Sequence, residues 1–209
     1  MNLDPHNWSP LSPAEVAEVL AGMPVPWWIA GGVALDLFLG RAMRTHEDID
    51  IQVLRRDQLI VQEHLQQHWR LFKTKQPTPP HLAPWPSGEF LEPPINSVWV
   101  RRPGEEAWAY MFMFMEAEGD RWVYRRLPAL GGRIADMGLT TDAGIPYLAP
   151  EIQLLYKSST GREKDADDLR RVLPRLPLPR AYWLLDALRT QYSDGHDWIG
   201  LIEEKLEVL

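Results

Sequence analysis

Between residues 29 and 55 the chain reads IAGGVALDLFLGRAMRTHEDIDIQVLR. A short apolar run over residues 27–30 is typical of a buried strand, and it leads directly into Gly31 and Gly32. From residue 33 to residue 39 the apolar positions follow helical spacing. A double glycine lets the backbone approach a ligand closely, and the start of the following helix presents unpaired N–H groups. The turn therefore predicts a phosphate-binding site, with a tight structural turn as the alternative.

A second strand follows, with two acids on one face. Apolar and polar residues alternate over residues 48–53, which is the period of a half-buried strand. Asp48 and Asp50 are two residues apart, so their carboxylates leave the same face about 7 Å apart. His46 continues this row. Two oxygen ligands at one exposed edge suit Mg²⁺, and a solvated acidic strand face is the alternative.

The two features lie close together in the sequence, with Arg41 and Arg44 between them. The helix start would hold phosphates, the metal would bridge them to the carboxylates, and the two arginines would neutralise further phosphate charge. The combination of the glycine turn with the two acids indicates a phosphate and metal site more specifically than either feature alone.

These residues resemble the signature of the polymerase-β-type nucleotidyltransferases. The similar branch contains aminoglycoside 2″-adenylyltransferases and lincosamide nucleotidyltransferases. A second stretch, residues 150–157 followed by Lys164-Asp165 and Asp168-Leu169, is similar to the C-terminal helices of bacterial relatives of that branch. Together the two stretches cover under a third of the chain.

The resemblance implies transfer of a nucleotide monophosphate to a hydroxyl of a small molecule. A hydroxyl would attack the α-phosphorus of a nucleoside triphosphate, with ATP as the expected donor, and pyrophosphate would leave. Asp48 and Asp50 would be catalytic and would bind one or two Mg²⁺ ions. By extension from the named relatives, the acceptor would be aminoglycoside-like. The implied nucleotide-binding residues are Gly31, Gly32, Arg41, Arg44, His46 and Lys157.

One strand departs from the family pattern. The family usually places a third carboxylate on a later strand, but the corresponding residues 108–115 contain no acid. Glu116, just beyond that strand, is the candidate general base. Glu89 or Glu92 in the proline-rich segment could supply the acid instead. If no acid does, the alternative is a catalytically silent nucleotidyltransferase-fold binding protein, such as an antitoxin or a regulator.

The remaining elements predict an α+β fold: a nucleotidyltransferase mixed sheet flanked by helices, with a C-terminal helical module. Ser12 and Glu15 predict the start of a first helix, and two or three antiparallel strands are expected between residues 98 and 125. Seven prolines over residues 77–94 predict a long irregular loop. Helices are expected over residues 151–157, 162–173, 180–189 and 198–208. The expected domains are a core at 10–127 and a helical module at 146–209.

The composition of the 209 residues excludes several classes of protein. There is no cysteine, which excludes a disulfide scaffold, a thiolate zinc site and a cysteine nucleophile. The formal charge of −7 argues against a nucleic-acid partner, because binding to the phosphate backbone needs a positive surface. No secretory signal and no apolar run of membrane-spanning length is found. We therefore expect a cytoplasmic protein without a membrane partner.

Overall fold

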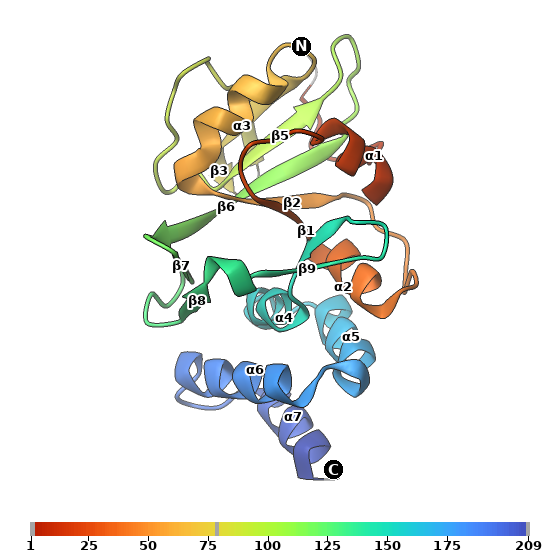
Figure 1. Cartoon of the computed structure of the whole chain (residues 1–209), viewed down its shortest axis with the longest axis vertical. Coiled ribbons are helices and arrows are strands. Elements are labelled where there is room, and N and C mark those ends of the chain that lie inside the picture. Colours follow the sequence, from red (N-terminus) through yellow and green to blue (C-terminus); the bar gives the residue numbers. More distant parts are fainter. Residues whose placement is uncertain (1–2, 78–79, 208–209) are drawn as a thin grey trace.

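The computed structural model describes residues 3–77 and 80–207 and contains a ten-stranded mixed sheet with helices on both faces (Figure 1). The strands are β1 (Trp27–Ala30), β2 (Asp50–Leu54), β3 (Arg70–Pro77), β4 (Pro80–Pro84), β5 (Ser97–Arg101), β6 (Tyr110–Glu118), β7 (Arg121–Val123), β8 (Gly131–Arg133), β9 (Gly138–Thr140) and β10 (Pro146–Leu148). The α-helices are α1 (Pro13–Val19), α2 (Gly31–Leu39), α3 (Gln58–Leu65), α4 (Pro150–Ser158), α5 (Glu163–Val172), α6 (Leu178–Gln191) and α7 (Asp197–Glu207). The α+β fold expected from the sequence is confirmed.

The strand that begins at Asp50 lies inside the sheet, whereas Asp48, expected on the same strand, lies two residues before its start. The strand order is β4-β3-β5-β6-β2-β1-β10-β9, and β7 and β8 continue from β6. β2 is antiparallel to β1 and parallel to β6. In this register Ala30 is the partner of Asp50 on one side, and Met111 is its partner on the other. The end of β1, which leads into the double glycine, therefore lies beside the start of β2.

The two faces of the sheet bury two different cores. Ile51 and Phe112 face α1 and α3, where they join a cluster that includes Val16 and Val61. Leu54 faces the opposite side and packs in a second cluster with residues of α4, α5 and α6. Figure 1 shows α1 and α3 on one side of the sheet and α4 to α7 on the other. Alternation along the strands therefore directs Asp50 and Gln52 toward the C-terminal helices.

The first helix begins where its sequence predicts, whereas the second begins at Gly31, two residues before the expected residue 33. Ser12 caps α1 by accepting from the backbone N–H of Glu15, and the Glu15 side chain accepts from the backbone N–H of Ser12. α2 begins at Gly31, immediately after β1, and ends at Gly40 in the left-handed conformation with φ of +69°. The direct strand-to-helix passage leaves no connecting residues between the sheet and the start of α2.

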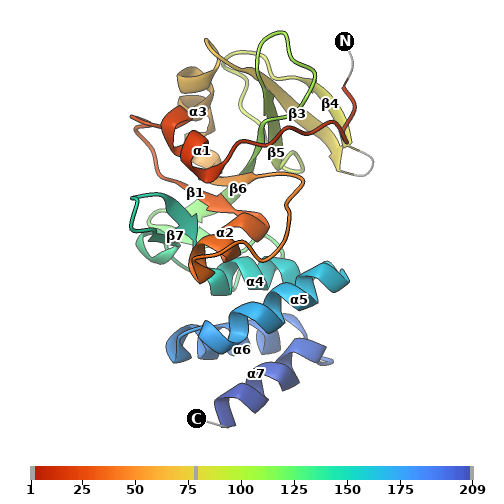
Figure 2. The ribbon, with the colours of Figure 1, turned by 90° about the vertical axis from the view of Figure 1, so that its right-hand side faces the viewer.

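The C-terminal helices stack under the sheet (Figure 2). α4 packs on α2, α5 and α6, and α7 packs on α6. Buried Trp198 and Ile202 attach α7 to the same core. The strands β8, β9 and β10, each three residues long, were not expected from the sequence. β10 pairs in parallel with β1 and leads directly into α4.

The prediction of an irregular loop over residues 77–94 is wrong in part. β4 pairs with β3 through residue pairs that include Phe72 with Pro84 and Lys73 with Ala83. β4 is at the edge of the sheet, where a proline that lacks an N–H removes no ladder hydrogen bond. Residues 78 and 79 of this segment lie outside the described residues. Within the described residues, no helix is long and apolar enough to cross a membrane.

Candidate active site

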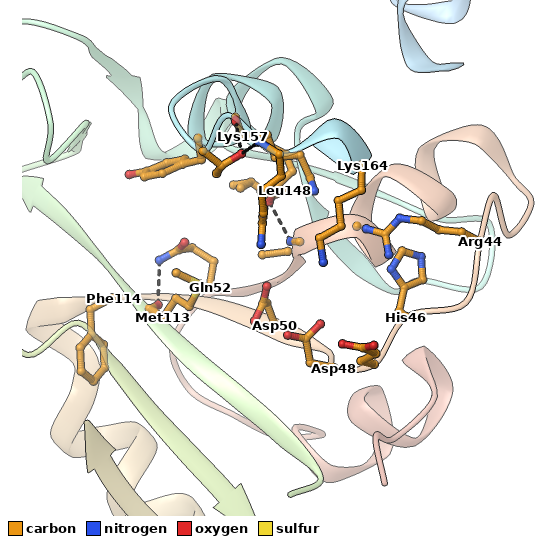
Figure 3. Close-up of a pocket in the computed structure, with 18 of the residues that line it drawn as sticks. Arg44, His46, Asp48, Asp50, Gln52, Met113, Phe114, Leu148, Lys157 and Lys164 are labelled. Carbon is orange, nitrogen blue, oxygen red and sulfur yellow. Dashed lines mark hydrogen bonds between the residues drawn. The ribbon is translucent and has the colours of Figure 1, made fainter. Parts of the chain in front are cut away.

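A cavity of about 400 Å³ lies between the sheet and the C-terminal helices. Its lining comes from the end of β1, the start of α2, residues 44–48, β2, β6, residues 125–126, the end of β10, α4 and residues 160–164. Figure 3 shows Asp48 and Asp50 in this cavity, between Arg44 and Lys164 on one side and Met113 and Phe114 on the other. Segments that are far apart in the sequence therefore form one cavity around the two acids.

Asp50 is the central acid of the cavity. It is the first residue of β2, and its Oδ1 atom is buried without a hydrogen-bond partner among the described residues. Burial raises the pKa of Asp50 to about 7, and the negative charge of Asp48 adds to this rise. The positive charges of Lys157, Arg162 and Lys164 act in the opposite direction. A bound cation would supply the charge that this buried carboxylate lacks.

The donor set fits Mg²⁺. Two carboxylates line the cavity two residues apart, and one of them has an unpaired buried oxygen. Mg²⁺ usually takes one or two carboxylates from a protein and completes its shell with water and phosphate oxygens. The described residues contain no group of three or more histidine, cysteine, aspartate or glutamate side chains that could hold a metal. The two carboxylates present suit a cation whose remaining ligands are water and phosphate oxygens.

Gly31 must be glycine for two separate reasons. Its φ of +69° belongs to the left-handed region, which L side chains rarely adopt. A Cβ atom at this position would lie 2.6 Å from Oδ2 of Asp50. The backbone N–H of Gly31 donates to Oε1 of Gln153 at 2.8 Å. The glycine thus allows the start of α2 to lie directly against the carboxylate.

Side-chain nitrogens of Arg44 and His46 lie close to Gly32. A Cβ atom at Gly32 would lie 2.6 Å from Nη2 of Arg44 and 2.7 Å from Nδ1 of His46. Nε2 of His46 is 2.7 Å from Oδ2 of Asp36, whose Oδ1 accepts from the backbone N–H of Met43 at 3.1 Å. Asp36 therefore fixes the imidazole, with its other nitrogen beside the start of α2. The guanidinium of Arg44 and the N–H groups at the start of α2 are hydrogen-bond donors where an anion would bind.

A buried ion-pair network joins the helical part of the chain to the cavity. Nζ of Lys157 lies 2.7 Å from Oδ1 of Asp165 and 2.8 Å from Oδ2 of Asp168. All three residues are buried, with at most 6% of each side chain exposed. Asp168 also lies 3.5 Å from Nε of Arg44. The carboxylates of α5 therefore hold cations from α4 and from the segment before β2 at the same cavity.

Seven of the predicted site residues line the cavity. They are Gly31, Gly32, Arg44, His46, Asp48, Asp50 and Lys157. Arg41, predicted to bind nucleotide, is exposed and is not among the lining residues, since Gly40 ends α2 just before it. The structure thus brings together the double glycine, the acids and the lysine, which are up to 126 positions apart.

The structure places Glu116 outside this cavity. Its Oε1 atom accepts from Nε of Arg55 at 2.5 Å. Glu116 belongs to the alternate set of β6 residues that includes Phe112 and Phe114, whereas Met113 shares the face of Gln52. Strand alternation therefore points Glu116 away from the acids. Glu89 and Glu92 are also absent from the lining, and Glu89 pairs with Lys73.

The face of β6 that meets the acids carries methionines in place of a third carboxylate. Met111 is the register partner of Asp50, and Met113 is the partner of Gln52. Nε2 of Gln52 donates to the backbone carbonyl of Met113 at 2.7 Å, as Figure 3 shows. The lining does contain one other carboxylate, on Glu47, which is exposed.

Sequence reasoning did not place several other lining residues. Gln153 and Tyr156 come from α4, and Arg125 comes from the segment after β7. Only the packing of α4 under β1 and β6 brings these side chains to the acids. No local spacing in the sequence signals that contact, although Gln153 and Tyr156 do lie in the second stretch that resembles the family.

Comparison with known proteins agrees with this geometry. Residues 14–79 match the family model described as aminoglycoside-2″-adenylyltransferase. No curated protein matches the chain at a significant level.

Two solved structures share the fold. The lincomycin-bound lincosamide antibiotic adenylyltransferase LnuA superposes with a TM-score of 0.52 at 20% identity, covering 79% of this chain and 97% of LnuA. ANT(2″)-Ia in complex with adenylyl-2″-tobramycin superposes with a TM-score of 0.54 at 13% identity, covering 86% of this chain and 95% of ANT(2″)-Ia. The chain therefore has the nucleotidyltransferase fold and, over residues 14–79, resembles the aminoglycoside 2″-adenylyltransferases.

Proposed function

We propose that the protein transfers a nucleotide monophosphate, with ATP as donor, to a hydroxyl group of a small molecule. The observation that carries the proposal is the buried, unpaired carboxylate oxygen of Asp50 beside the start of α2. The adenylyl group named for both solved structures supports ATP as the donor. Lincomycin and tobramycin, the compounds named for those structures, support a small acceptor.

Each part of the cavity has a task in this proposal. Asp48 and Asp50 would hold Mg²⁺, which supplies charge neutralisation and orientation of the phosphate oxygens when bound. The N–H groups at Gly32, together with Arg44, His46 and Lys157, would bind the β- and γ-phosphates. The acceptor oxygen then bonds to the α-phosphorus while the bond from that phosphorus to the bridging oxygen breaks. Pyrophosphate leaves with the electron pair.

The proton of the acceptor hydroxyl needs a base or water to receive it. Glu116 lies outside the cavity, as described above. Of the three lining carboxylates, Glu47 is the one that is not assigned to the metal. We therefore propose Glu47, in place of Glu116, as the proton acceptor. A Glu47→Gln variant is then expected to lose the acidic limb of the pH–rate profile while its affinity for ATP stays unchanged.

Pyrophosphate release tests the proposed function. The protein is incubated with Mg²⁺, labelled ATP and a panel of hydroxyl compounds that includes lincomycin and tobramycin. Asp48→Asn and Asp50→Asn are each expected to lower the rate by at least about 10²-fold, because a metal contributes several kcal/mol of transition-state stabilisation. Glu63→Gln, an exposed acid on α3, is the matched control and should retain full activity.

The second candidate is a nucleotidyltransferase-fold protein that binds nucleotide without turnover. The acid-free face of β6 is the observation that favours it. Calorimetry with Mg²⁺ and a non-hydrolysable ATP analogue separates the two functions. Nucleotide binding without release of pyrophosphate from ATP, whichever acceptor is added, supports the silent protein. Pyrophosphate release that depends on Asp48 and Asp50 supports the enzyme. Absence of both binding and release contradicts both functions.

A further inference from the structure

The charges of the cavity are distributed unevenly. All three lining carboxylates lie on the short segment from Glu47 to Asp50. Elsewhere the described lining contains no acid but contains six cations: Arg44, Arg125, Arg126, Lys157, Arg162 and Lys164. A polycationic acceptor would meet repulsion in most of this cavity, while an anionic one would be attracted.

Most of these cations already have partners within the protein. Arg44 and Lys157 pair with Asp168, and Arg162 pairs with Asp165 at 2.7 Å. Lys164 has no hydrogen-bond or ion-pair partner among the described residues, but it is exposed, so water solvates it. These four groups belong to the side of the cavity that would bind the triphosphate.

Arg126 is also occupied. Its Nη1 atom donates to the backbone carbonyl of Tyr156 at 3.0 Å and to the hydroxyl of Tyr124 at 3.2 Å. Its guanidinium carbon lies 5.6 Å from the centre of the Tyr156 ring, within the range of a cation–π contact. Arg126 therefore serves to fix α4 against the segment after β7.

Arg125 differs from the other five cations. It is half-buried, and it forms neither a hydrogen bond nor an ion pair with the part of the chain that the structure describes. A half-buried charge without a partner is less favourable than a paired one, and a ligand anion would supply the missing partner. Burial lowers the pKa of Arg125, which reflects the same missing counter-charge.

Arg125 lies away from the acids along β6. Asp50 is the register partner of Met111. Val123, two residues before Arg125, is the partner of Glu116, five positions further along the same strand. Arg125 therefore lies toward the β7 side of the cavity, and not at the side that would bind the metal and the triphosphate.

The residues around Arg125 are aromatic. Tyr124 is fully buried, and its hydroxyl donates to the backbone carbonyl of Leu155 at 3.4 Å. The ring of Tyr156 packs edge-on against the ring of Tyr124, with centroids 4.8 Å apart. Tyr156 and Met113 line the cavity together with Arg125. The guanidinium thus lies in a cavity that also presents an aromatic ring and a methionine.

We propose that Arg125 forms a subsite for a carboxylate or phosphate group of the acceptor, so that the acceptor is an anionic hydroxyl compound and not a polycation such as an aminoglycoside. This inference rests on the proposed nucleotidyl transfer. A guanidinium suits both anions because it donates two parallel hydrogen bonds to their oxygens. The neighbouring rings and methionine would contact the apolar part of the same molecule.

Inorganic phosphate is the probe that tests this subsite. The full-length protein is first saturated with Mg²⁺ and the non-hydrolysable analogue AMPCPP, so that the nucleotide's own phosphate sites are filled, and phosphate is then titrated by calorimetry. Wild-type protein is expected to bind phosphate, and Arg125→Gln to weaken that binding at least about tenfold. Arg125→Lys should retain part of it. Arg133→Gln, an exposed arginine outside the cavity, is the control that should behave as wild type.

The remaining outcomes overturn the inference in distinguishable ways. If wild type binds no phosphate, or if Arg125→Gln binds it equally well, no anion subsite exists at Arg125. If Arg125→Gln weakens AMPCPP as much as phosphate, the anion is a phosphate of the nucleotide and not of the acceptor. Tobramycin binding that is tighter than phosphate binding and unaffected by Arg125→Gln contradicts the anionic acceptor. Failure of wild type to bind AMPCPP at all contradicts the proposed function itself.

Discussion

Gly31 and Asp50 lie so close together that a single methyl group on the glycine would reach 2.6 Å from the carboxylate Oδ2. This contact joins the start of α2 to the first residue of β2. It exists because β1 and β2 are antiparallel neighbours, with Ala30 directly opposite Asp50. The glycine turn and the acid to which we assign phosphate and metal binding are therefore positioned by one pair of strands.

Gly31→Ala is expected to lower both stability and Mg²⁺ affinity. The left-handed backbone alone costs about 1–2 kcal/mol for a residue with a Cβ atom, and the contact with Asp50 adds to this. Gly40→Ala is a matched control, because Gly40 has the same φ of +69° and a Cβ atom there would meet nothing within 4 Å. Thermal unfolding and calorimetry should show an excess effect for Gly31→Ala. Equal effects of the two substitutions would exclude a role for the contact.

Asp50→Asn is expected to stabilise the metal-free protein in a pH-dependent way. The pKa of Asp50 is raised from 3.8 to about 7, so the folded state binds a proton there that the unfolded state has released. The unfolding free energy of wild type therefore falls as pH rises from about 4 to 7, relative to a variant that cannot ionise. Chemical denaturation across this range measures the difference. With Mg²⁺ present at pH 8 the order should reverse, because wild type alone gains stability from the bound ion. A difference that does not change with pH would contradict the buried state of this carboxylate.

Lys157→Met is expected to destabilise the protein by about 3 kcal/mol, since it removes the one buried cation from two buried carboxylates and leaves them only the more exposed Arg44 and Arg162. Both of its carboxylate partners have side chains that are at most 1% exposed. Arg170→Gln, which breaks the exposed pair with Asp167 on the same helix, should cost only about 0–1 kcal/mol. Denaturant unfolding of both variants makes the comparison. A Lys157→Met variant as stable as Arg170→Gln would show that the network carries little stability.

Glu116→Gln is expected to lose no more than about threefold in kcat/KM, because its carboxylate pairs with Arg55 outside the cavity. Removal of a general base costs about 10²- to 10⁴-fold. Stability should fall modestly, since Arg55 keeps its hydrogen bonds to the carbonyls of Leu91 and Ile95. Steady-state kinetics measure kcat/KM of the variant, and a melting curve measures its stability. A loss of 10²-fold or more with unchanged stability would restore Glu116 as the base.

The sequence predicted best where local pattern determines structure. The capping box at Ser12, the strand at residues 27–30 and the glycine turn each depend on neighbours within a few positions, and the structure contains all three. It predicted less well where partners are distant. The short strands β8 to β10 depend on pairing with β7 and β1, and edge placement permits the prolines of β4. The environments of Arg125 and Glu116 follow from the face of β6 and the packing of α4, which spacing alone does not reveal.

The ion pairs that join Arg44 to Asp168, and Asp168 to Lys157, have a consequence for the order of events during synthesis. A ribosome-bound chain that has emerged only as far as β10 carries both acids and the double glycine but lacks Lys157 and the aspartate that orients Arg44. Such a nascent chain cannot yet assemble the cavity to which we assign triphosphate binding. Chemical competence would therefore arise late, when α4 and α5 dock, and premature termination would yield an inert product.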